Sequence, residues 1–164
     1  MPLYANLVIG QDGSTTRNGT SKNLSSAEDR KRFHQLRSGV EAIVIGGKTA
    51  RLEPYAQTPA PLYVISRARE IKEIEANHQA KILNQDPKLA IKELKEKYPT
   101  KILFEGGAEL LNEIIDLVDQ LHITISKAIG DGQLVSFDGL TRDFVMEDKE
   151  DIDGETFYIF RRLK

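Results

Sequence analysis

A glycine pair followed by lysine and threonine ends a strongly apolar run early in the chain. The segment reads AIVIGGKTARLEP, from Ala42 to Pro54. A nucleoside-triphosphate loop would need a glycine at position 42 and a flexible loop before Gly-Lys-Thr, because the backbone must wrap around the phosphates. Ala42 and a β-branched run, typical of a strand, stand there instead. The sequence therefore excludes a loop of that kind.

The same glycines could still serve a phosphate. Glycines at a strand end let the backbone approach a ligand closely. A helix beginning near Lys48 would add free N–H groups and the positive end of its dipole, and Lys48 and Arg51 would add charge. The alternative is a plain strand-to-helix turn at Gly46 and Gly47, with Lys48 in solvent.

A second segment, ILFEGGAELLNEII, repeats this pattern farther along the chain. It places Glu105 before Gly106 and Gly107, with a helix to follow. In open α/β sheets, ligands bind at the carboxyl ends of the strands. Two such ends suit a ligand with several phosphates, such as a dinucleotide, although no Gly-x-Gly-x-x-Gly follows any strand. We expect Glu105 at a site; the alternative is a carboxylate that caps the helix.

Other polar groups are less specific. The loop from Gln11 to Ser21 contains glycines, and it is either a lid over an active site or a surface loop. Arg30 and Arg37 are of a kind usually solvated or paired with acids, but Arg37 could hold a substrate phosphate. The histidines show no metal-ligand spacing, and no Ser/His/Asp constellation stands out. Neither a metal site nor a hydrolase is predicted.

Composition narrows the function classes. The chain has 164 residues, a formal net charge of -2 and no cysteine. The charge gives no electrostatic case for nucleic acid or an anionic membrane as partner, and the lack of cysteine excludes a cysteine-ligated zinc. The first residues do not resemble a signal peptide, and no window reaches the length of a membrane span. We expect a cytoplasmic protein.

Short apolar runs alternate with helical patterns, which favours an α/β fold with a mostly parallel central sheet flanked by helices. Helices are expected after Ser26, with Phe33, Leu36 and Val40 at helical spacing, from Pro87, and over Ala108 to Leu117. The segment from Arg67 to Gln79 is expected to be a surface helix or loop. The strands are expected at Leu3 to Ile9, Ala42 to Ile45, Leu62 to Ile65, Lys81 to Leu83, Lys101 to Phe104 and Leu121 to Ile125.

The end of the chain has a different pattern. Two strand-like runs, DFVMEDKED and TFYIFRRL, enclose an Asp-Gly pair, which is a strong signal for a β-hairpin. The sheet is therefore expected to finish in an antiparallel pair. No repeat or linker divides the chain, so one domain is expected over residues 1–164.

The order of these residues resembles the reductase domain of riboflavin biosynthesis, the C-terminal domain of the bifunctional deaminase–reductase. The resemblance covers nearly the whole chain and implies a dihydrofolate reductase-like fold. The residues that carry it are Asn6, Asp12-Gly13, Gly19-Thr20-Ser21, Arg30, Leu36-Arg37, Glu41-Ala42-Ile43-Val44, Gly47, Thr49, Pro54, Glu105-Gly106-Gly107, Val118-Asp119 and Gly130.

The resemblance implies that NADPH binds and that the ribosyl group of 5-amino-6-(5-phosphoribosylamino)uracil is reduced to ribityl. Ser21, Arg37 and Glu105 match substrate-contacting positions. The resemblance assigns the cofactor to Thr49 and its neighbours at one sheet edge and to the helix start after the second glycine pair at the other. The expected cofactor-binding residues are Asn23, Gly46, Gly47, Lys48, Thr49, Arg51, Glu53, Gly106, Gly107, Ala108 and Glu109.

The chain also departs from the family pattern. Asn23 stands where many members have tryptophan, and the run after Pro54 lacks an arginine expected to help hold the ribose phosphate. These departures bear on the substrate more than on the cofactor.

The implied reaction is hydride transfer from NADPH to an imine carbon of the ring-opened substrate. Asp12, Glu105 or a bound water would supply the proton, and Lys48 and Arg51 would favour NADPH over NADH. Two alternatives stay open: a dihydrofolate- or pteridine-type reductase, and a dinucleotide-binding module without turnover. The resemblance also implies a homodimer.

Overall fold

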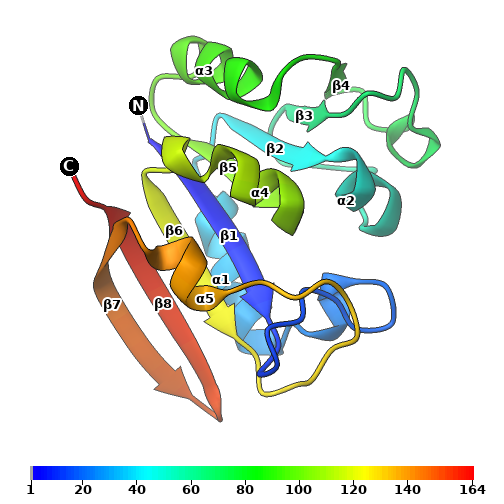
Figure 1. The fold of residues 1–164 in the computed structure, drawn as a ribbon. Helices are drawn as coiled ribbons and strands as arrows, with labels where there is room; N and C mark the ends of the chain where they lie inside the picture. Colours follow the sequence, from blue (N-terminus) through cyan, green and yellow to red (C-terminus); the bar gives the residue numbers. More distant parts are fainter. Residues whose placement is uncertain (1) are drawn as a thin grey trace.

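The computed structural model describes residues 2–164 and contains one mixed β-sheet of eight strands in the order β4-β3-β2-β5-β1-β6-β8-β7 (Figure 1). Strands β1 to β6 pair in parallel, and β8 is antiparallel to both β6 and β7. The predicted fold class is thereby confirmed. The strands are β1 (Leu3–Ile9), β2 (Ala42–Gly46), β3 (Leu62–Ile65), β4 (Ala80–Leu83), β5 (Ile102–Gly106), β6 (Gln120–Ile125), β7 (Phe144–Ile152) and β8 (Glu155–Arg162).

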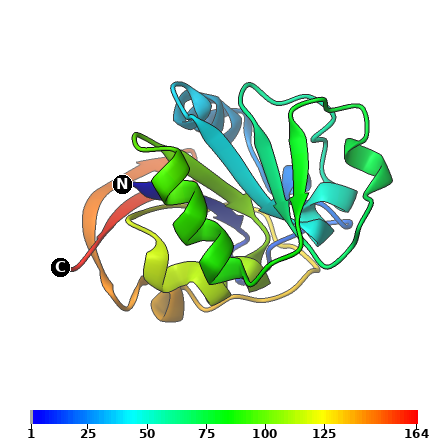
Figure 2. The same cartoon turned by 90° about the horizontal axis from the view of Figure 1, so that it is seen from above.

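Helices cover both faces of the sheet. Figure 2 shows α3 and α4 on one face and α1 on the other. Among residues 2–164, no helix is long and apolar enough to cross a membrane. The α-helices are α1 (Ala27–Arg37), α2 (Gly47–Leu52), α3 (Pro87–Lys97), α4 (Ala108–Ile114) and α5 (Phe137–Thr141), and the short 3-10 helices are η1 (Ser21–Asn23), η2 (Lys72–Ile74) and η3 (Ile115–Leu117).

The central strands are apolar throughout because both of their sides are covered. In β2, Ala42 and Val44 pack in the cluster beneath α3 and α4, whereas Ile43 and Ile45 pack in a second cluster on the other face. Alternate side chains of a strand point to opposite faces. The same alternation in β5 turns Phe104 toward the α3–α4 core, and this leaves Glu105 facing the side of the sheet that α1 covers.

Local signals set the element boundaries. Ser26 caps α1 by accepting a hydrogen bond from the Asp29 amide at 3.0 Å, and Asp86 caps α3 by accepting one from the Leu89 amide at 3.1 Å. The predicted hairpin is present, with Asp153 and Gly154 in the turn at φ 51° and 81°. Asparagine, aspartate and glycine tolerate this left-handed region, so the Asp-Gly signal was sufficient.

Some details differ from expectation. The apolar spacing of Phe33, Leu36 and Val40 does not mark a core face, because the buried residue of α1 is Asp29 and the helix ends before Val40. The segment from Arg67 to Gln79 is mainly loop around η2, with Ile71 and Ile74 buried in the second cluster. The predicted third helix divides into α4 and η3. Helix α5 was not predicted, because it is only five residues long.

His122 on β6 is a pH-sensitive element of the sheet. Its Nε2 lies 2.7 Å from Gln120 Oε1, and its ring lies 6.1 Å from that of Tyr4. Burial, with the charge of Lys101 adding to it, lowers the pKa of His122 to about 4. The folded state therefore holds the neutral imidazole and resists protonation, whereas the unfolded chain accepts a proton near its ordinary pKa of 6.5.

We expect the stability contribution of neutral His122 to be complete above pH 6.5 and to be lost as the pH falls toward 4. Because each tenfold preference for the neutral form is worth about 1.4 kcal/mol, the loss reaches about 3 kcal/mol. Urea unfolding of wild type and His122→Gln between pH 7 and pH 4 measures this, and the variant should show the shallower pH dependence. Equal slopes, or a wild-type His122 NMR titration near pH 6.5, would contradict the assignment.

Candidate active site

A cavity of about 370 Å³ opens at the carboxyl ends of β1 and β5, on the face of the sheet that α1 covers. Its size lies in the range of small-molecule sites. Elements far apart in the sequence build it: strand β1, the loop that follows it, helix α1, the start of α2, and the end of β5. The lining includes Asn6, Val8, Thr15, Ser21, Lys22, Ser25, Asp29, Arg30, Phe33, His34, Arg37, Lys48, Thr49, Glu53, Tyr55, Glu105, Gly106, Gly107 and Ala108.

The two glycine pairs of the sequence meet at this cavity. Strands β2 and β5 are neighbours, with Ile45 opposite Gly106. Thr49 of α2 lies against the second pair, since a Cβ added to Gly106 or Gly107 would stand 3.2 or 3.1 Å from Thr49 Oγ1. The Gly106–Gly107 peptide is cis. Between α2 and α4, the backbone of the second glycine pair therefore meets the Thr49 side chain directly.

The structure brings together most, but not all, of the predicted site residues. Nine of them line the cavity: Ser21, Arg37, Lys48, Thr49, Glu53, Glu105, Gly106, Gly107 and Ala108. Six others lie outside the lining: Asp12, Asn23, Gly46, Gly47, Arg51 and Glu109. Their proposed roles in catalysis and binding stay predictions, because geometry alone does not test them.

Arg37 and Glu105 form a buried ion pair at the base of the cavity. Arg37 Nε and one terminal nitrogen each donate to a different Glu105 oxygen at 2.7 Å. The Glu105 side chain has 0% exposure and that of Arg37 has 15%. Burial opposes the charge of Arg37, but the hydrogen bonds and charge of Glu105 outweigh it and raise the pKa of the guanidinium. Two of the five N–H donors of Arg37 are thus directed to Glu105.

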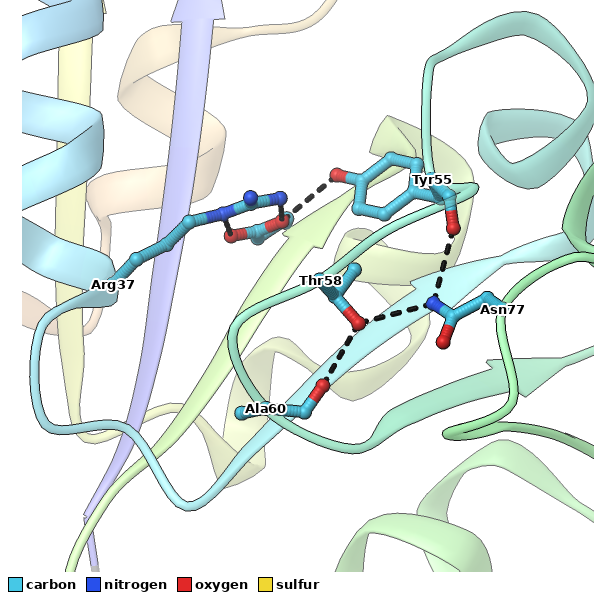
Figure 3. Close-up of polar contacts among 6 residues, drawn as sticks. Arg37, Tyr55, Thr58, Ala60 and Asn77 are labelled. Carbon is cyan, nitrogen blue, oxygen red and sulfur yellow. Dashed lines mark hydrogen bonds and ion pairs between the residues drawn. The ribbon is translucent and has the colours of Figure 1, made fainter.

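Tyr55 completes this network. Its hydroxyl donates to a Glu105 oxygen at 2.9 Å, and Figure 3 shows Arg37 and Tyr55 reaching toward each other from opposite sides. Burial and the Glu105 carboxylate raise the pKa of Tyr55 well above its ordinary value. The hydroxyl therefore stays protonated at neutral pH and serves as a donor.

The side-chain amide of buried Asn77 holds the loop that carries Tyr55. Asn77 Nδ2 donates to the Tyr55 carbonyl at 3.1 Å and to Thr58 Oγ1 at 3.0 Å (Figure 3). The Thr58 hydroxyl in turn donates to the Ala60 carbonyl at 2.8 Å. Asn77 thus positions a cavity residue from the segment between β3 and β4, a connection that no local sequence signal indicated.

The loop after β1 is attached to α2 through Glu53. The amide and hydroxyl of Ser21 donate to one Glu53 oxygen at 2.7 and 2.9 Å. Asn23 is exposed and donates from its side chain to the Arg17 carbonyl at 2.7 Å, within the same loop. The sequence left a lid or a surface loop open for this segment, and the structure shows a folded loop that lines one side of the cavity through Thr15, Thr16 and Ser21.

Asp12 lies in the same loop but is not among the residues that line the cavity. Its carboxylate accepts from the Ser14 hydroxyl at 2.5 Å and from the Ser14 amide at 3.2 Å. The hydrogen bond from the Ser14 side chain lowers the pKa of Asp12. In this conformation Asp12 organises the loop, and its role as a proton donor stays a prediction.

Sequence reasoning missed several cavity residues. Asp29, Phe33 and Tyr55 line the cavity. Asp29 resembled an ordinary first-turn acid of α1, and Phe33 resembled a core residue. The sequence pointed to Tyr55 only through its position, because it lies two residues after Glu53, a predicted site residue. The face of α1 toward the cavity is largely polar, and a search for apolar periodicity cannot find such a face.

Comparison with solved structures places this chain in the dihydrofolate reductase-like fold class. Dihydrofolate reductase from Enterococcus faecalis, complexed with NADP(H), matches with a TM-score of 0.77 at 14% identity, over 99% of this chain and 97% of that one. A pyrimidine reductase-like protein from Corynebacterium diphtheriae matches with a TM-score of 0.72 at 20% identity, over 99% and 92%. At these identities the likeness shows the fold.

The chain belongs to the RibD C-terminal domain family, whose sequence model matches residues 3–150. The expected family is thereby confirmed, and it implies an oxidoreductase. A deaminase and 5-amino-6-(5-phosphoribosylamino)uracil reductase from Thermotoga maritima has the same fold, with a TM-score of 0.74 at 18% identity, and this chain spans 56% of its length. No curated protein sequence matches the chain.

We expect Glu105→Gln to destabilise the fold by about 3–5 kcal/mol, because it leaves the buried Arg37 charge without its partner. Tyr55→Phe should cost about 1 kcal/mol, the value of one hydrogen bond. Urea unfolding measures both. Glu113→Gln is the control, since it makes the same change on an exposed position of α4. A Glu105→Gln variant as stable as the Glu113→Gln variant would show that the ion pair contributes little.

Proposed function

We propose that this chain is an NADPH-dependent reductase of riboflavin biosynthesis, which reduces the ribosyl group of 5-amino-6-(5-phosphoribosylamino)uracil to ribityl. The main support is the family match together with a cavity at the carboxyl ends of parallel strands, flanked by two glycine pairs. Lys22, Arg30 and Lys48 line this cavity as well as Arg37. This cationic lining suits a phosphorylated substrate and a phosphorylated cofactor.

The residues at the glycine pairs fit a dinucleotide. Glycines stand at the N-terminal ends of α2 and α4, and the Thr49 side chain lies against Gly106 and Gly107. A Cβ on Gly47 would stand 2.7 Å from Ser66 Oγ, so the ends of β2 and β3 are also in close contact. Ser66 and Arg67, just after β3, thereby join Lys48 and Arg51 near one sheet edge. We assign the diphosphate of NADPH to the backbone at Gly107 and Ala108. We assign its extra phosphate to the cations Lys48, Arg51 and Arg67.

Bound NADPH would supply the hydride, and the protein would supply orientation and a site shielded from water. The Arg37–Glu105–Tyr55 network would hold these three lining residues in fixed positions relative to one another. Arg37 gives two of its five N–H donors to Glu105 and would offer the others to the substrate. Lys22 and Arg30 are further cations on the α1 side for the ribose phosphate. The proton would come from water or from Asp12 after movement of its loop. Glu105 accepts three hydrogen bonds as a carboxylate, so it would have to take up a proton before it could donate one.

The decisive assay follows NADPH oxidation with 5-amino-6-(5-phosphoribosylamino)uracil, run beside dihydrofolate. We expect turnover with the pyrimidine and none with dihydrofolate. Reduction of dihydrofolate alone would instead establish a pteridine-type reductase. Tight NADPH binding without oxidation by either compound would establish a binding module. The expected homodimer and cytoplasmic location stay predictions.

Replacing Lys48 should weaken NADPH selectively. We expect Lys48→Ala to raise the KM for NADPH about tenfold, the effect of losing one charge-assisted contact, and to change the KM for NADH less than twofold. Lys92→Ala, at an exposed position of α3, is the matched control and should leave both values unchanged. If the wild type uses NADH as well as NADPH, the proposed role of the cations is wrong.

A further inference from the structure

The loop that carries Tyr55 is attached to the rest of the protein mainly by side chains. Among residues 2–164, no backbone–backbone hydrogen bond joins residues 54–60 to another segment. Asn77 Nδ2 donates to the Tyr55 carbonyl at 3.1 Å and to Thr58 Oγ1 at 3.0 Å. Gln79 Nε2 donates to the Thr58 carbonyl at 3.3 Å. Within the described part of the chain, Asn77 is thus the one residue that bonds the Tyr55 backbone.

Asn77 is itself fixed at the edge of the sheet. It is 7% exposed, and its Oδ1 accepts from the Gln79 amide at 3.0 Å. Its backbone amide donates to the carbonyl of buried Ile74, and its carbonyl accepts from the amide of Ala80, the first residue of β4, both at 3.0 Å. The Asn77 side chain uses both N–H donors and the acceptor oxygen of its amide, and no acid or alcohol of similar size offers this combination.

The Tyr55 side chain extends this attachment to the ion pair of the cavity. Its hydroxyl donates to Glu105 Oε1 at 2.9 Å, and the same oxygen accepts from a terminal nitrogen of Arg37 at 2.7 Å. The central carbon of the Arg37 guanidinium lies 5.7 Å from the centre of the Tyr55 ring. In Figure 3 the Tyr55 ring points toward Arg37, and the Tyr55 carbonyl points toward Asn77. A shift of the loop would therefore carry the phenol off Glu105 and leave the carboxylate and the guanidinium free to turn.

We propose that Asn77, which lies outside the cavity lining, is a positioning residue for the substrate. By holding the Tyr55 carbonyl, it keeps the phenol on Glu105. This contact fixes the direction in which Arg37 offers its remaining N–H donors to the substrate. The inference rests on the proposed function, which supplies the substrate. It predicts an effect on substrate binding and none on NADPH, because the loop begins only after α2 and the first glycine pair.

The first test compares Asn77→Ala with Asn84→Ala. Asn84 follows β4 and donates from the same side-chain nitrogen to the Ser66 and Ala68 carbonyls at 2.6 and 2.8 Å, so it holds the loop after β3 instead. We expect Asn77→Ala to raise the KM for 5-amino-6-(5-phosphoribosylamino)uracil about tenfold, the effect of one lost hydrogen bond to a charged group. Its NADPH dissociation constant should stay within about twofold of wild type. Asn84→Ala should leave the substrate KM unchanged, and any effect should fall on NADPH.

The KM separates positioning from a mere loss of structure. A variant that only unfolds more easily has fewer active molecules, which lowers the apparent kcat and leaves the KM unchanged. Tyr55→Phe, alone and combined with Asn77→Ala, completes a double-mutant cycle. Because both residues act on the same carboxylate, the KM of the double variant should stay well below the product of the two single effects. Effects that multiply would overturn the proposal, and so would a substrate KM of Asn77→Ala within about threefold of wild type.

A measurement without turnover follows the Arg37 Nε–H group directly. Arg37 Nε donates to Glu105 at 2.7 Å, so its proton should exchange slowly with solvent, and ¹H–¹⁵N NMR measures the rate, with Arg37→Lys for assignment. Asn77→Ala and Tyr55→Phe should each speed this exchange about tenfold, whereas Asn84→Ala should not. An exchange rate of Asn77→Ala equal to that of wild type would overturn the proposal.

A milder variant keeps the test valid if Asn77→Ala folds poorly. In Asn77→Ser, the hydroxyl can still accept from the Gln79 amide, but the shorter side chain loses the Tyr55 carbonyl. The same changes in KM and in proton exchange are expected of it. A well-folded Asn77→Ser variant with wild-type KM and wild-type exchange would contradict the proposal.

The inference and the proposed function fail in different ways. If the wild type does not oxidise NADPH with the pyrimidine substrate, the proposed function is wrong, and the exchange of the Arg37 proton decides on Asn77. Faster exchange in Asn77→Ala would then support the control of Arg37 by Asn77, and unchanged exchange would overturn it. If the wild type turns over and Asn77→Ala has an unchanged KM, the inference alone is wrong.

Discussion

The pairing of Arg37 with Glu105 is the constraint on which the cavity depends. It connects the last residue of α1 to the end of β5, immediately before the glycine pair. A bidentate contact fixes both the distance and the relative orientation of two planar groups. Because the pair is buried, moving α1 away from the sheet would expose the partners separately or leave one unpaired, which is strongly unfavourable. The ion pair therefore fixes the end of α1 against β5, and both elements line the cavity.

The same contact explains how the chain can keep polar groups beneath a helix. Most surface helices of α/β proteins bury an apolar stripe, whereas α1 buries an aspartate and turns a largely polar face toward the cavity. Such a helix gains little from hydrophobic burial. Its capping serine, the ion pair and the contact of Arg37 with Phe33 hold it in place instead. Because this polar face of α1 is not packed against an apolar core, it can line the cavity.

Sequence periodicity was sufficient for the sheet and insufficient for the site. Strands covered on both faces are continuously apolar, so β2 and β3 were located closely, and Asp-Gly located the hairpin. The glycine pairs indicated the strand ends at which the cavity opens, because parallel strands place their carboxyl ends together. Asp29 and Tyr55 were missed because their roles depend on contacts across the fold. Asn77, which positions Tyr55 from a distant loop, has no local signature at all.

The edges of the sheet have a consequence for the behaviour of the chain in concentrated solution. The outer strand β7 is long and exposed, but its central residues from Glu147 to Asp151 are all charged. The opposite edge, β4, has only four residues. Unpaired backbone groups at a sheet edge can recruit a strand from another molecule, and charges and short strands discourage this. Two β7 strands, both mainly acidic, would repel each other. Growth of the sheet from one molecule to the next is therefore disfavoured at both ends.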